Sequence, residues 1–257
     1  MAILIDKKIY DFGKKIFKIN RSITGNGARL TLLNIKKELK NLKILQIKSG
    51  TKVYDWTIPQ EWNVKQAYVE DKFKKKIIDI KKNNLHLIGY STPCNFYLKK
   101  KELLSRIYSI KQKPNAIPYV TSYYNKFWGF CDTYQNREKI INYYSDEDRF
   151  FVKIDSSFKK KGNLTYGELV IPGQSSQEIL ISTYICHPEM ANNELSGPMV
   201  AIALAKYFQK KKNKKTLRFL FIPETIGSIA YINKNLNALK NKVIAGYVLS
   251  CIGDERS

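Results

Sequence analysis

The first forty residues carry a helical pattern of apolar side chains that is interrupted once. This pattern predicts two helices, over residues 3–19 and 27–42. The interruption is the segment Arg21-Ser-Ile-Thr-Gly-Asn-Gly27, in which glycine and asparagine break the helical period. The chain is therefore expected to open with two helices and a tight connection between them.

The pattern then changes to short apolar alternations separated by turn residues, which are typical of β-structure. It predicts strands at 43–47, 52–56, 66–69, 76–80 and 85–88, with one short helix at 101–110. We therefore expect residues 45–148 to form a small β-rich domain, inserted after residues 1–44, which hold the N-terminal helices of the main domain.

Regular alternation of strands and helices marks residues 149–257, the remainder of the main domain. The predicted elements are strands 150–155, 165–171 and 178–185, helix 196–209, strand 216–222, helix 226–236 and strand 242–250. The last five alternate between strand and helix, which favours an α/β fold with a mostly parallel sheet and crossover helices. Strand 216–222 is apolar on both faces, as expected of an interior strand.

Size and composition are those of a folded protein. The 257 residues are 44% apolar and 12% aromatic, which excludes a disordered tail or linker. No apolar run reaches the roughly 18 to 20 residues of a membrane-spanning helix, and the opening residues lack the features of a signal peptide. We therefore expect a cytoplasmic protein, in which the four widely spaced cysteines are reduced thiols.

The net charge of +23 suggests an affinity for polyanions, but its make-up argues against a nucleic-acid partner. Only seven of the 45 basic residues are arginine; the rest are lysines scattered among isoleucine and asparagine. Proteins that recognise bases and phosphates use bidentate arginine contacts and basic residues clustered on one face. Nucleic-acid binding is therefore disfavoured. Binding to some other polyanion remains a separate hypothesis, and it predicts an affinity that falls steeply with salt.

Polar residues follow three successive predicted strands. His187, Glu189 and Glu194 follow strand 178–185, Glu224 follows strand 216–222, and Asp254-Glu255 follow strand 242–250. In open α/β sheets, ligands bind beyond the carboxyl ends of the strands. One imidazole and up to five carboxylates are thus expected on a single rim.

This combination of side chains suits a zinc ion that keeps one position open for water. A glutamate that does not bind the metal could then act as general base. Other interpretations exist for single residues: His187 as a loop or capping histidine, and Glu224 as a carboxylate stabilised by the dipole of the following helix. Both interpretations are less favoured because the two residues follow adjacent strands of the predicted sheet and are expected at the same rim.

Three other motifs do not support the chemistry that they imitate. His187-Pro188-Glu189 imitates the HxE of zinc deaminases, but no PCxxC follows. Gly25-Asn26-Gly27 lacks the preceding strand of a phosphate-binding loop, and a turn at a helix start explains it. Cys186 stands beside His187, but adjacent side chains at a strand end are expected to point apart, which disfavours a thiol nucleophile.

Eight strings of the sequence carry a family likeness: Arg21–Gly27, Val53–Pro59, Glu61–Asn63, Ala116–Tyr124, Trp128–Cys131, Leu164–Leu169, Ser182–Pro188 and Phe221–Ser228. They resemble the corresponding strings of bacterial aminopeptidase-like proteins that are associated with polysaccharide biosynthesis and related to the zinc aminopeptidases. The likeness runs from about residue 10 to the end of the chain.

The resemblance implies a zinc-aminopeptidase-like, three-layer α/β fold interrupted by a small β-rich domain. It implies that His187 is the first zinc ligand, that Glu224 is the general base, and that the region of Asp254 supplies a later carboxylate. Asn193 stands where the related enzymes have a bridging Asp, although the adjacent Glu194 could serve instead.

Two further departures reduce the expected metal content. Thr225 replaces a second Glu ligand, and the other histidine, His86, falls in the inserted domain. No candidate remains for the C-terminal His of the related enzymes. An intact two-zinc site is therefore not expected, and we expect the chain to bind one zinc ion or none.

Two main hypotheses follow. In the first, His187, Glu194 and Asp254 hold zinc, and Glu224 activates water against an amide bond of a peptide or an aminoacylated sugar. In the second, the chain is a catalytically inactive relative that binds a glycan intermediate or a protein partner through the rim and the aromatic-rich insert. The chain stops where similar proteins continue, so we also expect a truncated product, or a second polypeptide that completes the fold.

Overall fold

The computed structural model describes residues 7–122 and 124–254, and the chain divides into two compact units. Met1–Glu61 and Lys159–Ser257 form one, called here the α/β unit, and Trp62–Phe158 form the other, called the inserted unit. Both boundaries lie later in the chain than those expected for a 45–148 insert. The first differs because residues 43–48 form a strand in the sheet of the α/β unit.

Among the described residues, the α/β unit contains four helices, a π-helical turn and seven strands. Its helices are α1 (Lys7–Phe17), α2 (Asn26–Glu38), α5 (Ser196–Phe208) and α6 (Ile226–Lys242), and its π-helical turn is η2 (Ala191–Leu195). Its strands are β1 (Lys43–Lys48), β2 (Lys52–Val53), β3 (Trp56–Thr57), β10 (Asn163–Ile171), β11 (Ser175–Tyr184), β12 (Lys215–Ile222) and β13 (Val243–Val248). Residues 3–6 of the predicted helix 3–19 lie outside the described residues.

Five strands form the central sheet, in the order β1-β10-β12-β11-β13. β12 and β13 both run parallel to β11, and α5 and α6 are the crossovers, as the alternation of elements predicts. β10 is antiparallel to both β12 and β1, which makes the sheet mixed. The α/β class is thus confirmed, and within this sheet the parallel pairs are β11 with β12 and β11 with β13.

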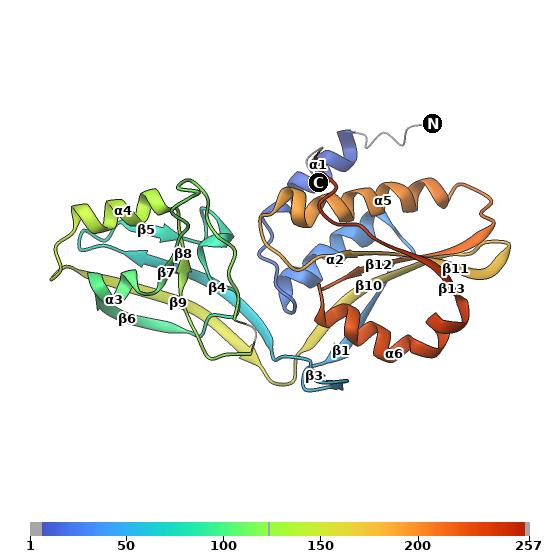
Figure 1. Cartoon of the computed structure of the whole chain (residues 1–257), viewed down its shortest axis with the longest axis horizontal. Coiled ribbons are helices and arrows are strands. Elements are labelled where there is room, and N and C mark those ends of the chain that lie inside the picture. Colours follow the sequence, from blue (N-terminus) through green and yellow to red (C-terminus); the bar gives the residue numbers. More distant parts are fainter. Residues whose placement is uncertain (1–6, 123, 255–257) are drawn as a thin grey trace. The chain divides into compact units, whose positions relative to one another are not determined.

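The sheet is the middle of three layers. Figure 1 shows α1, α2 and α5 on one face of the sheet and α6 on the other. Leu217, Phe219 and Phe221 alternate along β12 and join the core beneath the first group of helices, where Leu32 and Ile202 are fully buried. Each such side chain contributes about 1.5 to 3 kcal/mol on burial, so this core holds β11 and β12 rigidly.

The inserted unit is built on a four-stranded sheet of order β5-β4-β9-β6. Its strands are β4 (Glu61–Glu70), β5 (Lys76–Asp79), β6 (Cys94–Lys99), β7 (Ile107–Tyr108), β8 (Phe130–Cys131) and β9 (Arg149–Lys159), and its helices are α3 (Lys100–Leu104), α4 (Tyr134–Tyr143) and the 3-10 turn η1 (Asn84–His86). Strand 85–88 was predicted wrongly, because Asn83 accepts a hydrogen bond from Leu85 N and starts η1.

Helix α4 was not expected from the sequence. Its N-terminus is capped by Thr133, whose side chain accepts a hydrogen bond from Asn136 N at 3.1 Å. Only Ile140 is buried in this helix, so its apolar stripe is too narrow to be recognised from periodicity.

Two further expectations concern the whole chain. All four cysteines are free thiols in the structure. In the part of the chain that is described, no helix combines the length and the apolarity needed to cross a membrane.

Candidate functional site

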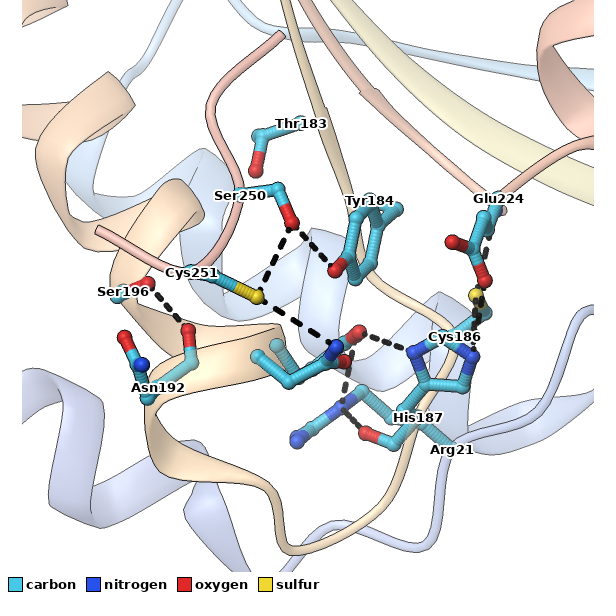
Figure 2. Close-up of polar contacts among 12 residues, drawn as sticks. Arg21, Thr183, Tyr184, Cys186, His187, Asn192, Ser196, Glu224, Ser250 and Cys251 are labelled. Carbon is cyan, nitrogen blue, oxygen red and sulfur yellow. Dashed lines mark hydrogen bonds and ion pairs between the residues drawn. The ribbon is translucent and has the colours of Figure 1, made fainter. Parts of the chain in front are cut away.

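The carboxyl ends of three parallel strands meet at one edge of the sheet in the α/β unit. Tyr184, at the end of β11, pairs with Ile222 at the end of β12, and Ser182 pairs with Val248 at the end of β13. The segments that follow these strands therefore lie together, and Figure 2 shows residues from all three in one cluster. This is the rim at which the sequence places its polar residues.

His187 lies between two carboxylates. Its Nδ1 is 3.0 Å from Oε2 of Glu194, and its Nε2 is 3.2 Å from Oε2 of Glu224. Glu194 belongs to η2, whereas Glu224 follows β12, so two separate segments supply the pair. The structure thus brings together three of the four residues that the sequence singles out.

The two carboxylates differ in environment. The side chain of Glu194 is fully buried, whereas that of Glu224 is 48% exposed. Burial raises the pKa of Glu194, an effect that contact with His187 and the charge of Arg21 oppose. Different environments allow two chemically similar groups to take different roles.

Arg21 is a site residue that sequence reasoning missed. Its guanidinium donates to His187 O from Nε at 2.9 Å and to Ile16 O from Nη1 at 2.6 Å. Nε also lies 3.6 Å from Oε1 of Glu194, and burial lowers the pKa of Arg21. Arg21 opens the string Arg21–Gly27, which is interpreted above as a turn between two helices and as part of the family resemblance. The basic residue at the start of this string was the signal that could have identified it.

Cys186 contacts His187 although their side chains were expected to point apart. Its Sγ is 3.9 Å from Nε2 of His187 and accepts a hydrogen bond from Glu224 N at 3.2 Å. The regular alternation of side chains ends with β11 at Tyr184, so it does not govern these two residues. Burial raises the pKa of the Cys186 thiol well above its usual value.

The residues present fit one metal ion. Cys186, His187 and Glu194 each offer one ligand atom, and these atoms lie within 4.8 Å of one another. Thiolate, imidazole and carboxylate are all ordinary zinc ligands. The guanidinium of Arg21 opposes a metal there, because it is a positive charge already in contact with Glu194.

A pair of zinc ions does not fit the described residues. Asn193, which stands in place of a bridging Asp, points its amide at Cys251 Sγ with an N–S distance of 3.7 Å. Thr225, which replaces a second Glu, has a φ of 54°, a strained conformation for a β-branched residue. His86 lies in the inserted unit, with Nδ1 2.9 Å from Cys131 O.

Asp254 lies outside the group of three metal-ligand candidates. Its Oδ2 accepts a hydrogen bond from Asn192 Nδ2 at 3.2 Å. Asn192 belongs to η2, the turn that also carries Glu194, so Asp254 is tied to the same segment. Its role as a ligand stays a prediction.

Tyr184 forms a wall of the site that the sequence did not indicate. Its ring meets that of His187 edge-on with centroids 5.4 Å apart, and its hydroxyl lies 2.6 Å from Ser250 Oγ (Figure 2). Tyr184 therefore links the segment after β13 to the imidazole.

Comparison with known proteins identifies relatives of this chain. A curated relative from Clostridium acetobutylicum, described as a "Putative polysaccharide biosynthesis protein with aminopeptidase-like domain", is 45% identical over 96% of this chain. A crystal structure of a "putative peptidase" from the same species superposes with a TM-score of 0.91 at 45% identity over 96% of this chain. This chain spans 55% of the curated relative and 57% of the crystallised one.

A more distant structure shares the fold. The zinc aminopeptidase BSAP from Bacillus subtilis superposes with a TM-score of 0.63 at 12% identity, over 98% of this chain and 71% of that one. The family model described as "Domain of unknown function (DUF4910)" matches residues 10–257. The chain therefore belongs to this family, and its fold is that of the aminopeptidase-like proteins.

Proposed function

We propose that this chain carries part of the active site of an aminopeptidase-like metallohydrolase that cleaves a peptide or amide bond. The observation that carries the proposal is the placement of His187 between buried Glu194 and half-exposed Glu224, at the carboxyl ends of parallel strands. Because the chain spans about half of its relatives, the activity is proposed for a protein in which this rim is one part of the site.

One zinc ion per chain is the proposed cofactor. His187 and Glu194 would hold it, Cys186 is the third donor within reach, and Asp254 stays a predicted ligand. A zinc ion held there would supply Lewis acidity, which makes water more acidic and an amide carbonyl more electrophilic.

Glu224 is the proposed general base. Its partly exposed carboxylate can meet water, while its Oε2 stays 3.2 Å from Nε2 of His187. It would take a proton from the attacking water at a carboxylate oxygen and return it to the leaving amine. Glu194 is fully buried and out of reach of solvent, so it is suited to holding and orienting His187 rather than to exchanging protons.

The proposed substrate class is a peptide or an aminoacylated sugar. The amide bond follows from the aminopeptidase-like fold, and the sugar from the name of the curated relative. Both substrates present an amide or amine next to a carbonyl, which is the group that a general base and a metal ion act on together.

A second candidate is a catalytically inactive relative that binds a glycan or a protein partner. Arg21 favours it, because a buried guanidinium already neutralises Glu194 without a metal ion. β13 also favours it: Ile244, Tyr247 and Val248 are 53%, 60% and 73% exposed on the last strand of the sheet. A second polypeptide could extend the sheet by pairing with β13.

Zinc content per chain, measured by mass spectrometry on the purified protein, tests the first candidate. We expect one zinc in the wild type, loss of zinc in His187→Ala, and retained zinc in Glu224→Gln. Hydrolysis of leucine p-nitroanilide should be lost in both variants. Glu147→Gln is the matched control, because it removes a carboxylate that is 81% exposed in the inserted unit.

The outcomes separate the candidates. Wild-type protein without zinc and without turnover would reject the metallohydrolase and favour the inactive relative. Zinc binding that survives His187→Ala would reject the assigned ligand. For the second candidate, Val248→Lys should prevent the association of a partner chain at β13, as seen by light scattering.

A further inference from the structure

The inserted unit contains a cavity of about 750 Å³ that plays no part in the proposed hydrolase. Residues of α4 line it together with residues of β5 and of the turn between β4 and β5, and Figure 1 shows α4 and β5 next to each other. Its volume lies in the range of sites that take small ligands, about 300 to 1,000 Å³. We propose that this cavity binds an acidic saccharide, meaning a sugar that carries a carboxylate or a phosphate.

Two exposed aromatic side chains line the cavity. Phe73 is 64% exposed and Tyr143 is 70% exposed. The ring of Tyr143 contacts that of Tyr144 edge-on, with the ring centroids 4.9 Å apart. The Tyr144 hydroxyl in turn donates a hydrogen bond to Asp71 Oδ2 at 2.8 Å. Aromatic rings left in water beside a cavity offer flat apolar surfaces that suit the faces of sugar rings.

Ammonium groups line the same cavity. Lys75, Lys82 and Lys139 are exposed, and none of the three forms an ion pair in the part of the chain that the structure describes. Lys76 also lines the cavity, and the four lysines outnumber the three carboxylates of the lining, those of Asp71, Asp132 and Glu138. This excess of positive charge favours a ligand with a negative group.

Asp132 adds a buried acceptor. Its Oδ1 accepts hydrogen bonds from Thr133 N at 2.7 Å and Asn136 Nδ2 at 3.2 Å. Its Oδ2 is buried and has no hydrogen-bond partner among the described residues, although Asp132 lines the cavity. A buried oxygen without a donor costs free energy, and a sugar hydroxyl would supply that donor.

These groups together point to a sugar rather than to a simple anion. An inorganic anion would use the lysines but not the aromatic rings or the carboxylate oxygen of Asp132. The side chains of Gln135 and Asn142 also line the cavity and can both donate to and accept from hydroxyl groups. The proposal rests on the inserted unit alone, so it does not depend on zinc binding at His187.

Calorimetric titration of the whole chain at about 150 mM salt tests the proposal, since nonspecific attraction to a +23 protein is screened there. The probes are trigalacturonic acid, which carries carboxylates, UDP-glucose, which carries phosphates, and neutral maltotriose. We expect one acidic probe to bind and maltotriose to bind at least about tenfold more weakly.

Two exposed substitutions locate the site. Lys139→Ala and Tyr143→Ala should each weaken binding by about fivefold or more. Lys160→Ala removes the same charge at an exposed position of the α/β unit and should leave binding unchanged. Far-ultraviolet circular dichroism would show that each variant is folded.

Each contrary result overturns a defined part of the proposal. Equal weakening by Lys160→Ala would show general attraction to the basic surface. Equal binding of maltotriose would remove the acidic group from the ligand, and binding that is unaffected by Tyr143→Ala would move the site elsewhere. Absence of binding by all three probes would reject the saccharide altogether. Binding of galacturonate or of the nucleotide sugar alone would identify a carboxylate or a phosphate as the negative group.

Discussion

The guanidinium Nε of Arg21 lies 3.6 Å from Oε1 of Glu194, and both side chains are completely buried. The two residues are brought together by packing of the α1–α2 connection against η2 in the same unit. In a buried pair, each charge depends on the other, so removal of one partner leaves an uncompensated charge in the interior.

Arg21→Met should therefore destabilise the α/β unit by about 3 kcal/mol or more. The double variant Arg21→Met/Glu194→Gln should lose less stability than Arg21→Met alone, because it no longer has a buried carboxylate without a partner. Urea unfolding of both variants, and of Glu194→Gln alone, measures the coupling. Additive losses would show that the two charges do not interact.

The same pair predicts a pH dependence. Burial gives Glu194 a pKa above its ordinary value, so the folded state keeps a proton that the unfolded state releases. Stability contributed by this group is then lost as pH rises from the ordinary value of 4.5 towards the raised one. Arg21→Met should extend this loss to higher pH, because it removes a charge that opposes the rise in the pKa of Glu194, and Glu194→Gln should abolish the loss, in thermal melts between about pH 4 and 7.

Gly197 allows α5 to lie close to the segment after β13. A Cβ added there would lie 2.2 Å from Leu249 O and 2.4 Å from Thr183 Oγ1. Gly197→Ala should cost about 1 to 3 kcal/mol. Gly246→Ala is the matched control, because the nearest atom to its added Cβ is 3.9 Å away, and it should change stability by no more than about 0.5 kcal/mol.

Arg218 connects two glutamates within the sheet. It binds Glu178 through Nε at 2.6 Å and Nη2 at 2.9 Å, and it binds Glu168 through Nη1 at 2.7 Å. Arg218→Met should lower the free energy of unfolding by about 2 kcal/mol, below the value for a fully buried pair because the side chain is 16% exposed. Lys72→Ala, which breaks an exposed pair with Asp148, should have little effect in the same assay.

Cys251 should be the reactive cysteine of the native protein. Burial raises the pKa of Cys94 to about 11 and that of Cys131 to about 12, and it also raises the pKa of Cys186. These three thiols stay protonated near pH 8, whereas the thiolate is the nucleophile. Ellman's reagent should find one rapidly reacting thiol, which Cys251→Ser removes, and four in denaturant.

The sequence predicts the C-terminal elements well because their patterns are strong. Helix 196–209 and strand 216–222 nearly match α5 and β12, since both segments are apolar enough to be buried wherever they pack. Helix α4 and turn η1 were not predicted because local hydrogen bonds define them, which the side chains of Thr133 and Asn83 accept from Asn136 N and Leu85 N, and neither element has a clear apolar pattern.

The sequence by itself determined the α/β class and a rim that includes His187, Glu194 and Glu224, because parallel strands bring their carboxyl ends to one edge. Only the tertiary structure decided which rim residues touch. Asp254 forms a hydrogen bond with Asn192, and Cys186 contacts His187. Arg21, which is distant in sequence, lies next to Glu194. Strand periodicity ends where these loops begin, so the contacts depend on side-chain packing between segments distant in sequence, which no local pattern encodes.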